Sequence, residues 1–340
     1  MKFFLHASNI HQGGGRTLLL ALLAVLNDRS CIALLDERLV IPVDLQKNIE
    51  VVRVPPSVFG RLRAEARLRR LVASTDVVLC LGNLPPLFGA AGRVVVFLQN
   101  RYLLSSPLSE MPWRPRLRLM IERIWLRRRL IDANVVVQSE SMARDTKAVL
   151  GVDAVVAPFL RTPAPIPVGR AERPTYDFVY VASGEPHKNH HNLVAAWIEL
   201  AKNELRPSLA LTLDRDFHPQ LVNWIESMSR QHGLPIDNLG QLSGEAVAQL
   251  YGRCRALVYP SRFESFGVPL VDADRAGLQI LAPEADYVRD VVVPVETFDP
   301  ESPVSICRAV RRYLGQPEAP NPVLSPEEFV TRILALDSRS

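Results

Sequence analysis

Two series of short apolar segments, rich in valine and isoleucine, constrain the fold of this chain more than any other feature. Helix-like segments separate most of them. The first series lies at 2–7, 31–35, 51–54, 77–81, 94–98 and 134–137, and the second at 178–182, 209–213, 256–259 and 279–282. Strands that are apolar along their whole length, with helices between them, are typical of a parallel sheet covered on both faces. The sequence therefore predicts an α/β protein with two doubly wound, Rossmann-like domains and a cleft between them.

A proline-rich segment separates the two series. Three prolines lie between residues 163 and 167, and proline fits neither a helix interior nor a central strand. We expect a first domain over 1–165, a linker at 166–175 and a second domain over 176–340. The sequence Ser-Pro-Glu-Glu at 325–328 is typical of a helix start. It predicts a final helix that either stays with the second domain or returns to the first.

Composition excludes some classes of protein. With 48% hydrophobic residues over 340 positions, the chain can build full cores and is not disordered. Residues 1–170 contain 24 Lys and Arg against 13 Asp and Glu, whereas the rest contains 16 against 23. This asymmetry indicates that the first domain faces something anionic.

The sequence also predicts a cytoplasmic protein. Its start has no recognisable secretory signal, and the longest apolar run, Leu18–Leu26, is about half the ~20 residues of a membrane span. The four cysteines form no CxxC pair, which favours reduced, packed thiols over disulfides or a zinc site.

The segment 259–277 contains the most informative motif. A strand ends at Tyr259, and a loop with Glu264 leads to a helix that Pro269 begins. Amides at such a helix start, near Phe266, Gly267 and Val268, suit a phosphate group. Two carboxylates flank this anion site, Glu264 before it and Asp272 within the helix. Sugar hydroxyls, a diphosphate and ribose hydroxyls would satisfy that arrangement, as in a nucleotide sugar.

This segment resembles the E-x7-E motif of retaining glycosyltransferases with the GT-B architecture, the group 1 family of bacterial cell-surface polysaccharide synthesis. Glu264 stands at the first acidic position, and Asp272 at the second, where the family normally has Glu. The resemblance implies that Glu264 holds the donor sugar, as a catalytic residue, and that Asp272 holds the ribose. The alternative is that Glu264 is a solvated loop residue and Asp272 only complements the helix dipole.

A second motif, at 178–190, has a strand, a turn of small residues and then Lys188. It resembles the family's strand and loop after the linker, in which Lys188 corresponds to the phosphate-binding lysine, a catalytic role. The common arginine of the family is Ser183 here, and the arginine of a variant motif is His187. The resemblance thus implies donor contacts at these three positions, with one cationic partner missing or replaced.

A third motif is the glycine run Gly13, Gly14 and Gly15 after the first strand. Glycines allow a phosphate to approach the backbone closely, and the resembling family has a Gly-Gly loop here that faces the donor phosphates. The alternative is a plain tight turn. Candidates for the acceptor side of the cleft are His6, His11, Asn100 and Arg101.

Two D-x-D pairs, at 214–216 and 272–274, superficially suggest a metal site. They lack the sequence context of the other main glycosyltransferase architecture, so we expect neither metal nor cofactor.

Arginines are concentrated at 61–70 and 114–129. Within the second stretch, Leu117, Ile121, Ile124 and Trp125 recur at helical spacing. Either this helix packs its apolar face on its own domain, or it contacts an anionic membrane surface. No nucleic-acid-binding motif accompanies the arginines, so nucleic acid is not an expected partner.

Together these features predict a cytoplasmic, retaining hexosyltransferase, peripheral on the inner face of the plasma membrane if the basic helix binds lipid. It would move a sugar from a nucleotide-sugar donor to a glycan or lipid-linked acceptor, as in lipopolysaccharide synthesis, without metal. Two alternatives remain, a nucleotide-sugar epimerase on the same fold and a non-catalytic protein that binds lipids or polyanions.

Overall fold

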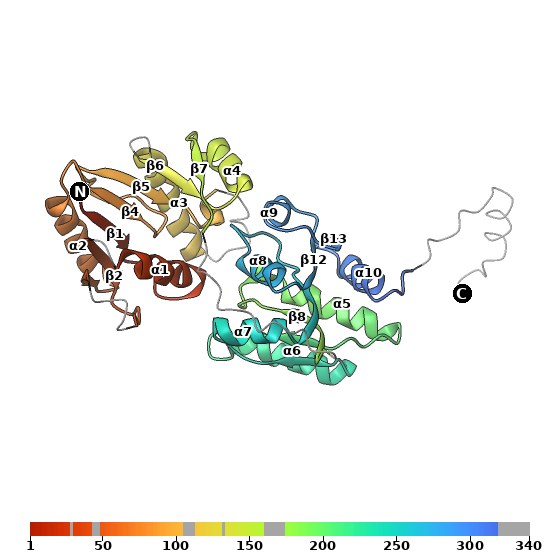
Figure 1. Cartoon of the computed structure of the whole chain (residues 1–340). Coiled ribbons are helices and arrows are strands. Elements are labelled where there is room, and N and C mark those ends of the chain that lie inside the picture. The colour runs from red at the N-terminus through yellow and green to blue at the C-terminus, as the bar shows by residue number, and fades with distance from the viewer. Residues whose placement is uncertain (28–29, 43–47, 105–112, 131–132, 160–173, 319–340) are drawn as a thin grey trace, which may run out of the picture.

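The computed structural model describes residues 1–27, 30–42, 48–104, 113–130, 133–159 and 174–318. Its strands form two separate sheets (Figure 1), one on each side of the proline-rich segment. Most of the expected linker at 166–175, and the expected final helix from residue 325, lie outside the described residues.

The first domain has a seven-stranded parallel sheet in the order β3-β2-β1-β4-β5-β6-β7. Its strands are β1 (Phe3–Ala7), β2 (Cys31–Asp36), β3 (Ile49–Val54), β4 (Val77–Cys80), β5 (Arg93–Phe97), β6 (Asn134–Val137) and β7 (Ala154–Val156). Its helices are α1 (Gly13–Leu26), α2 (Val58–Leu71), η2 (Arg101–Leu103), α3 (Trp113–Arg129) and α4 (Glu140–Leu150). Two apolar clusters fill the two faces of the sheet, one beneath α1 and the other beneath α2 to α4. The doubly wound arrangement is confirmed.

The second domain has a six-stranded parallel sheet in the order β10-β9-β8-β11-β12-β13. Its strands are β8 (Tyr176–Tyr180), β9 (Leu209–Leu211), β10 (Ile236–Asn238), β11 (Cys254–Val258), β12 (Gln279–Pro283) and β13 (Glu296–Phe298). Its helices are η5 (Pro186–Lys188), α5 (His190–Lys202), α6 (Pro219–His232), α7 (Gly244–Tyr251), α8 (Val268–Arg275), α9 (Asp286–Arg289) and α10 (Pro303–Tyr313). One cluster of buried apolar side chains, centred on Trp197 and Tyr180, forms its core.

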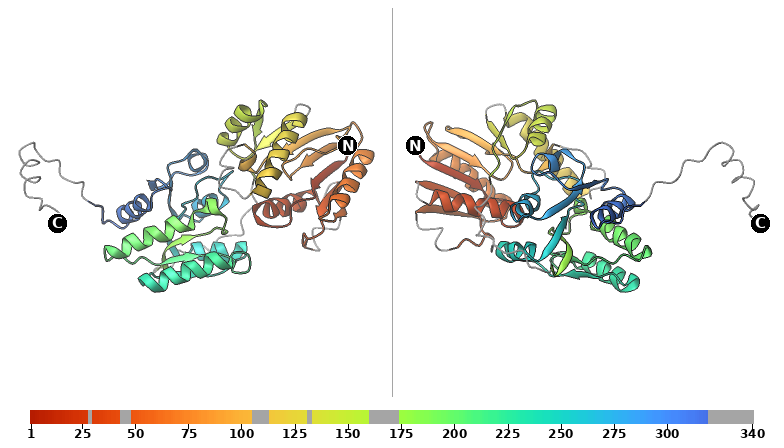
Figure 2. Two further views of the ribbon diagram at one scale, coloured as in Figure 1. Left: turned by 180° about the vertical axis from the view of Figure 1, so that it is seen from behind. Right: turned by 45° about the vertical axis from the view of Figure 1, so that its right-hand side comes forward.

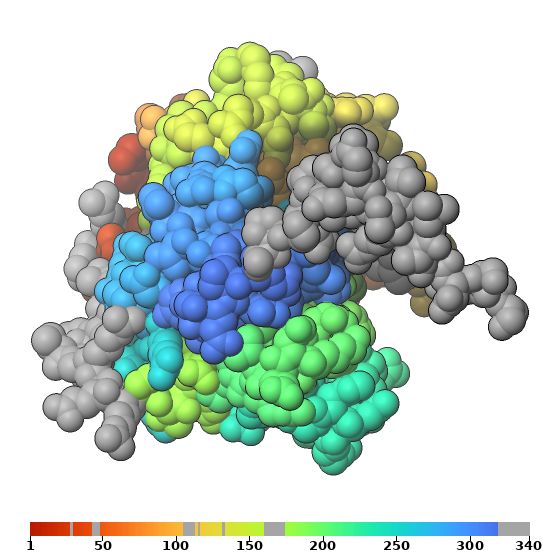
Figure 3. All heavy atoms as spheres, turned by 90° about the vertical axis from the view of Figure 1, so that its right-hand side faces the viewer, coloured from red at the N-terminus to blue at the C-terminus, as the bar shows by residue number. Residues whose placement is uncertain are grey.

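The carboxyl end of the first sheet faces the second domain (Figure 2). Residues 99–102, which follow β5, contact the loop after β11. Farther from this contact, α4 meets α9, where yellow-green and blue surfaces touch in Figure 3. Parallel strands whose carboxyl ends face a crevice are where α/β proteins bind ligands. The fold therefore positions a site between the domains.

Helix α3 only partly fits one of our two expectations. Leu119 and Leu126 face the core, but Leu117, Ile121 and Ile124 are each about half exposed, at 50%, 56% and 49%. Trp125, the fourth member of the row, is partly buried with its Nε1 atom covered, so the row packs on its own domain only in part and neither interpretation is excluded. Within the described residues, none of the helices is both long enough and apolar enough to cross a membrane.

Candidate functional site

The loop between β11 and α8 positions the central carboxylate. β11 ends at Val258, and α8 begins at Val268 with Pro269 in its first turn. Gly267 has a φ of +73°, and a Cβ there would lie 2.9 Å from the Leu270 side chain, so glycine is required. No side chain caps the start of α8. Pro269 has no amide hydrogen and Leu270 N donates to Gly267 O at 2.9 Å, so the amides of Gly267 and Val268 are the ones that this turn can offer to an anion.

Three donors converge on one oxygen of Glu264. Oε1 accepts hydrogen bonds from Lys188 Nζ at 2.6 Å, Ser261 Oγ at 2.6 Å and Tyr259 OH at 2.9 Å. The other oxygen, Oε2, accepts no hydrogen bond from any residue that the structure describes. The carboxylate is thus held firmly in place while one oxygen stays able to bind a ligand hydroxyl. Glu264 is not a solvated loop residue.

Electrostatics keep Glu264 ionised. Burial alone would raise the pKa of its carboxyl group, but the positive charge and hydrogen bond of Lys188 outweigh burial and hold that pKa below the ordinary 4.5. Lys188 and Glu264 are only 14% and 11% exposed. The site therefore contains a largely buried ion pair.

The backbone around Lys188 is held by polar contacts. Tyr180 OH donates to Lys188 O at 2.7 Å. Asn189, in the left-handed region at φ 64°, donates from Nδ2 to Pro260 O at 3.1 Å. This second bond ties the Lys188 turn to the start of the loop that carries Glu264. Two segments far apart in the sequence are thereby fixed side by side.

Ser183 and His187 do not supply a second cation. Ser183 Oγ donates to the carboxylate of Glu185. The pKa of His187 lies below 6.5, because the ring is buried and Lys188 is adjacent. At neutral pH His187 is uncharged, so it does not replace the arginine of the variant motif.

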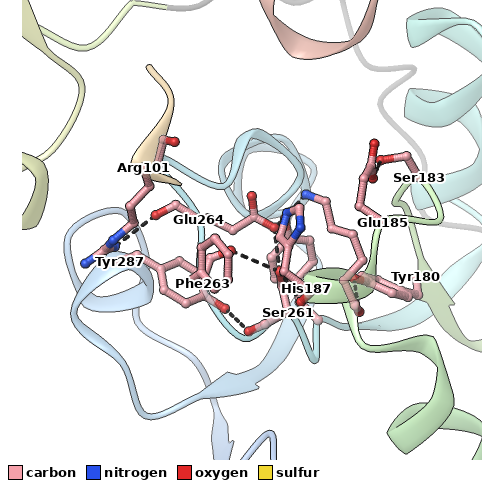
Figure 4. Close-up of polar contacts among 12 residues, drawn as sticks. Arg101, Tyr180, Ser183, Glu185, His187, Ser261, Phe263, Glu264 and Tyr287 are labelled. Atoms are coloured by element: carbon pink, nitrogen blue, oxygen red, sulfur yellow. Dashed lines mark hydrogen bonds and ion pairs between the residues drawn. The ribbon is translucent and has the colours of Figure 1, made fainter. Parts of the chain in front are cut away.

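A cavity of about 140 Å³ lies beside this ion pair, lined by both domains. Its lining residues are Gln99, Asn100, Arg101, Tyr102, His187, Phe263, Glu264 and Ser265. Tyr102 packs edge-on against His187 and Phe263, which are stacked with their centroids 4.8 Å apart. Figure 4 shows Arg101 reaching the Glu264 segment from the first domain. The cavity is therefore an interdomain feature.

The acceptor-side candidates are dispersed. Asn100 and Arg101 line the cavity. His11 lies instead 4.0 Å from the buried carboxylate of Asp36. His6 is 7% exposed and bonds Glu65 at 2.8 Å, so its expected place in the cleft is wrong. Its ring neutralises a buried carboxylate inside the first domain.

The glycine run forms the start of α1. Gly13 has a φ of +66°, and a Cβ on Gly13 or Gly14 would have no atom within 4 Å. A Cβ on Gly15 would lie 3.9 Å from Gln99 Oε1. The run therefore lies beside a residue that lines the cavity, and space remains next to its first two members.

Asp272 lies on α8, as expected. Burial raises the pKa of its carboxyl group, an effect that the nearby charge of Arg275 opposes, and this carboxylate accepts no side-chain hydrogen bond from any described residue. Phe266 is buried beside the helix start. Of the two D-x-D pairs, Asp214 accepts backbone hydrogen bonds within its own loop. Across the part of the chain that the structure describes, no group of three or more His, Cys, Asp or Glu could hold a metal ion.

Several residues of the site were not anticipated. Tyr259, Ser261, Phe263 and Ser265 belong to the 259–277 motif, which gave them no role of their own, and Tyr102 lies outside every motif. Tyr259 and Ser261 lie just before Glu264 in the sequence, so these hydroxyl groups could have been predicted to bond its carboxylate. Tyr102 offered no local signal, because its partners lie in the other domain.

Comparison with known proteins shows similarity to a family. Residues 168–323 match the model of glycosyl transferases group 1. A serotype-specific mannosyltransferase, WbdA, of Escherichia coli is 28% identical over 159 residues, which are 41% of this chain and 17% of that protein. A Mycobacterium tuberculosis glycogen synthase is 27% identical over 175 residues, 50% of this chain and 39% of that protein. This chain thus spans about a sixth of WbdA.

Solved structures share the whole two-domain arrangement. Anabaena HepE, in complex with UDP and glucose, has a TM-score of 0.68 at 17% identity over 92% of this chain and 90% of that one. WaaG, a glycosyltransferase involved in lipopolysaccharide biosynthesis, has a TM-score of 0.64 at 15% identity over 93% and 91%. The fold is therefore GT-B, and residues 168–323 are similar to the glycosyl transferases group 1 family.

Proposed function

We propose that this chain is a retaining, metal-independent glycosyltransferase that moves a hexose from a nucleotide sugar to a glycan or lipid-linked acceptor. One observation carries the proposal. The carboxylate of Glu264 is buried, ionised and bound to Lys188 at 2.6 Å, beside a cavity that both domains line. Similarity of residues 168–323 to a glycosyltransferase family supports this function.

The donor would bind across the Lys188–Glu264 pair. An ammonium group has three donors, so Lys188 can keep its bond to Glu264 and still donate to a diphosphate oxygen. The uncapped start of α8 offers backbone amides to the same phosphates. Oε2 of Glu264 would accept hydrogen bonds from sugar hydroxyls, and Asp272, farther along α8, from the ribose. Each group then has a distinct part of the donor to hold.

Transfer would proceed through charge that develops on the diphosphate. As the bond from the anomeric carbon to the phosphate oxygen breaks, Lys188 and the α8 amides stabilise the departing anion. The acceptor oxygen forms the new bond on the same face, which retains the configuration, and its proton passes to the departing phosphate. With Ser183 in place of arginine and His187 neutral, Lys188 supplies the nearby charge.

The donor is proposed to be a nucleoside-diphosphate hexose. HepE is described with UDP and glucose, and WbdA as a mannosyltransferase. We therefore infer a role in making a cell-surface polysaccharide or lipopolysaccharide. A thermal-shift screen with UDP-glucose and GDP-mannose tests this step, because a ligand at about 100 times its Kd adds ~2.7 kcal/mol of stability. A stabilising nucleotide sugar that yields free or transferred sugar supports the proposal; the absence of any shift contradicts it.

None of the findings favours the epimerase alternative. Incubation of the stabilising nucleotide sugar without acceptor distinguishes the two reactions. An epimerised nucleotide sugar would mark an isomerase. A donor that stays unchanged without acceptor, and is consumed once acceptor is added, marks a transferase. Lipid binding without nucleotide-sugar binding would instead support the non-catalytic alternative.

We propose further that the enzyme works in the cytoplasm, peripheral on the inner face of the plasma membrane. Leu117, Ile121 and Ile124 of the apolar row of α3 are exposed. Three arginines of the same helix are exposed as well: Arg116, Arg127 and Arg128. Exposed apolar side chains and arginines together suit an anionic lipid surface. A membrane-bound acceptor would then meet the basic first domain.

A further inference from the structure

Two domains share the task of holding Glu264. Its side chain is held by the second domain alone, through Lys188, Tyr259 and Ser261. Its backbone is held from the first domain, because Arg101 Nη1 donates to Glu264 O at 2.9 Å. A contact that crosses the cleft therefore holds the backbone from which the carboxylate projects.

Contacts within the first domain hold the Arg101 side chain in the orientation that reaches Glu264. Its Nη2 donates to Asp145 Oδ2 on α4 at 2.9 Å, and the arginine side chain is 15% exposed. Asn100 caps the short helix η2, on which Arg101 lies, by accepting from the amide of Tyr102 at 3.1 Å. A guanidinium has a rigid, planar set of donors. Because Asp145 binds Nη2 of the guanidinium group, Nη1 is oriented toward the carbonyl oxygen of Glu264.

The residue after Glu264 is held in the same way. Ser265 Oγ donates to Gln99 O, and Ser265 O accepts from Ser139 Oγ at 3.2 Å. On the other side of Glu264, the ring of Phe263 packs edge-on against Tyr102 at 4.8 Å. The three consecutive residues 263–265 thus contact the first domain, and Glu264 is the middle one.

We propose that Arg101 is a positioning residue that sets the Glu264 backbone, so that the sugar-binding carboxylate reaches its working geometry only when the two domains are closed. This inference rests on the proposed function. Diphosphate binding, by contrast, uses Lys188 and α8 of the second domain and does not require Arg101. Closure of the cleft then completes the site for transfer while the nucleotide is already bound.

Kinetics of Arg101→Ala test the proposal. A displacement of the reacting groups by about 1 Å costs on the order of 100-fold in rate, so we expect kcat to fall about 10- to 100-fold. The Kd of the nucleoside diphosphate should stay within about twofold. Arg101→Lys can reach the Glu264 carbonyl with one donor and should recover part of the lost kcat. Asp145→Ala removes the residue that orients Arg101 and should lower kcat in the same direction.

The chain offers a matched control in Arg144. Its Nη2 also bridges the domains, to Asp286 at 2.5 Å, but these partners are 60% and 71% exposed and lie away from Glu264. Exposed pairs contribute little, so Arg144→Ala should leave kcat within about twofold. If Arg101→Ala is no slower than Arg144→Ala, or if its loss of activity is matched by a loss of diphosphate affinity, the proposal is overturned. An acceptor KM that rises with kcat unchanged would make Arg101 an acceptor contact instead and would also overturn it.

A second measurement does not depend on catalysis. Amide hydrogen exchange over residues 261–267 reports whether the loop is held. Arg101→Ala should accelerate exchange there at least about 10-fold relative to the wild-type protein. Arg144→Ala should exchange at the wild-type rate. Equal protection in all three would show that Arg101 does not set the loop. If the wild-type protein transfers no sugar at all, the proposed function fails while this arm still decides the role of Arg101.

Discussion

Replacing Lys188 by methionine should destabilise the second domain because it leaves Glu264 charged and largely buried. The Lys188 Nζ to Glu264 Oε1 distance is 2.6 Å. At an effective dielectric constant of about 20, the direct attraction across it is about 6 kcal/mol. The cost of desolvating both groups offsets part of this attraction, and removing one partner of a buried pair typically costs about 3–5 kcal/mol. We expect the free energy of unfolding to fall by about 3 kcal/mol at pH 7.

Two comparisons isolate the ion pair from simple loss of packing. Glu264→Gln in the Lys188→Met background removes the unpaired charge, so the double variant should recover at least about half of the loss. The pH dependence gives the second comparison. Because the folded-state pKa of Glu264 in the wild-type protein lies below 4.5, its ionised form stabilises the fold above that pH, and this contribution is lost as the pH falls through the folded-state pKa. Without Lys188, burial should raise the same pKa, so the deficit of the variant should shrink near pH 4.

Urea denaturation of the three proteins at pH 4 and pH 7, followed by tryptophan fluorescence, measures these differences. Trp197 and Trp224 lie in the second domain, and Trp197 is in its core. Titration calorimetry of Lys188→Met with a nucleoside diphosphate checks the functional side, where affinity should fall while nucleoside binding changes little. The reasoning is refuted if the double variant is as unstable as the single one, or if the deficit is the same at both pH values.

The remaining predictions concern catalysis, metal and membrane. Glu264→Gln should lower turnover by at least about 100-fold while the diphosphate Kd changes much less, since the carboxylate acts on the sugar; unchanged transfer rates would remove Glu264 from the mechanism. Activity should survive EDTA, because Lys188 and the α8 amides supply positive charge; loss with EDTA and recovery with manganese or magnesium would contradict this. The protein should co-sediment with anionic but not neutral vesicles at low salt and be released at high salt, since exposed charges are screened within about 10 Å at ~0.1 M. Ile121→Asp in the apolar row of α3 should weaken that binding. A wild-type protein that stays in the supernatant with anionic vesicles at low salt would contradict the proposed membrane contact.

Local sequence determined the sheets and the central motif. The long strands could be predicted because strands buried on both faces are apolar at every position. The loop with Glu264 and the helix after it could be predicted for a similar reason, since a strand end, a glycine and a proline each act on the neighbouring backbone; the helix begins at Val268, one residue before the expected Pro269. Of the three-residue strands, β9 was predicted because its apolar run continues to Leu213, whereas β7, β10 and β13 lack such a run and were missed.

Tertiary structure alone decided the partners of these residues. Helical spacing in α3 identified an apolar row but could not say whether that row faces the core or the solvent. His6 pairs with Glu65 rather than lining the cleft, since the Glu65 side chain of α2 reaches β1. Arg101 and Glu264 are 163 residues apart in the sequence, yet they meet across the cleft. The sequence could define the carboxylate because its neighbours along the chain form the loop, whereas contacts between the domains depend on how two separately folded sheets pack together.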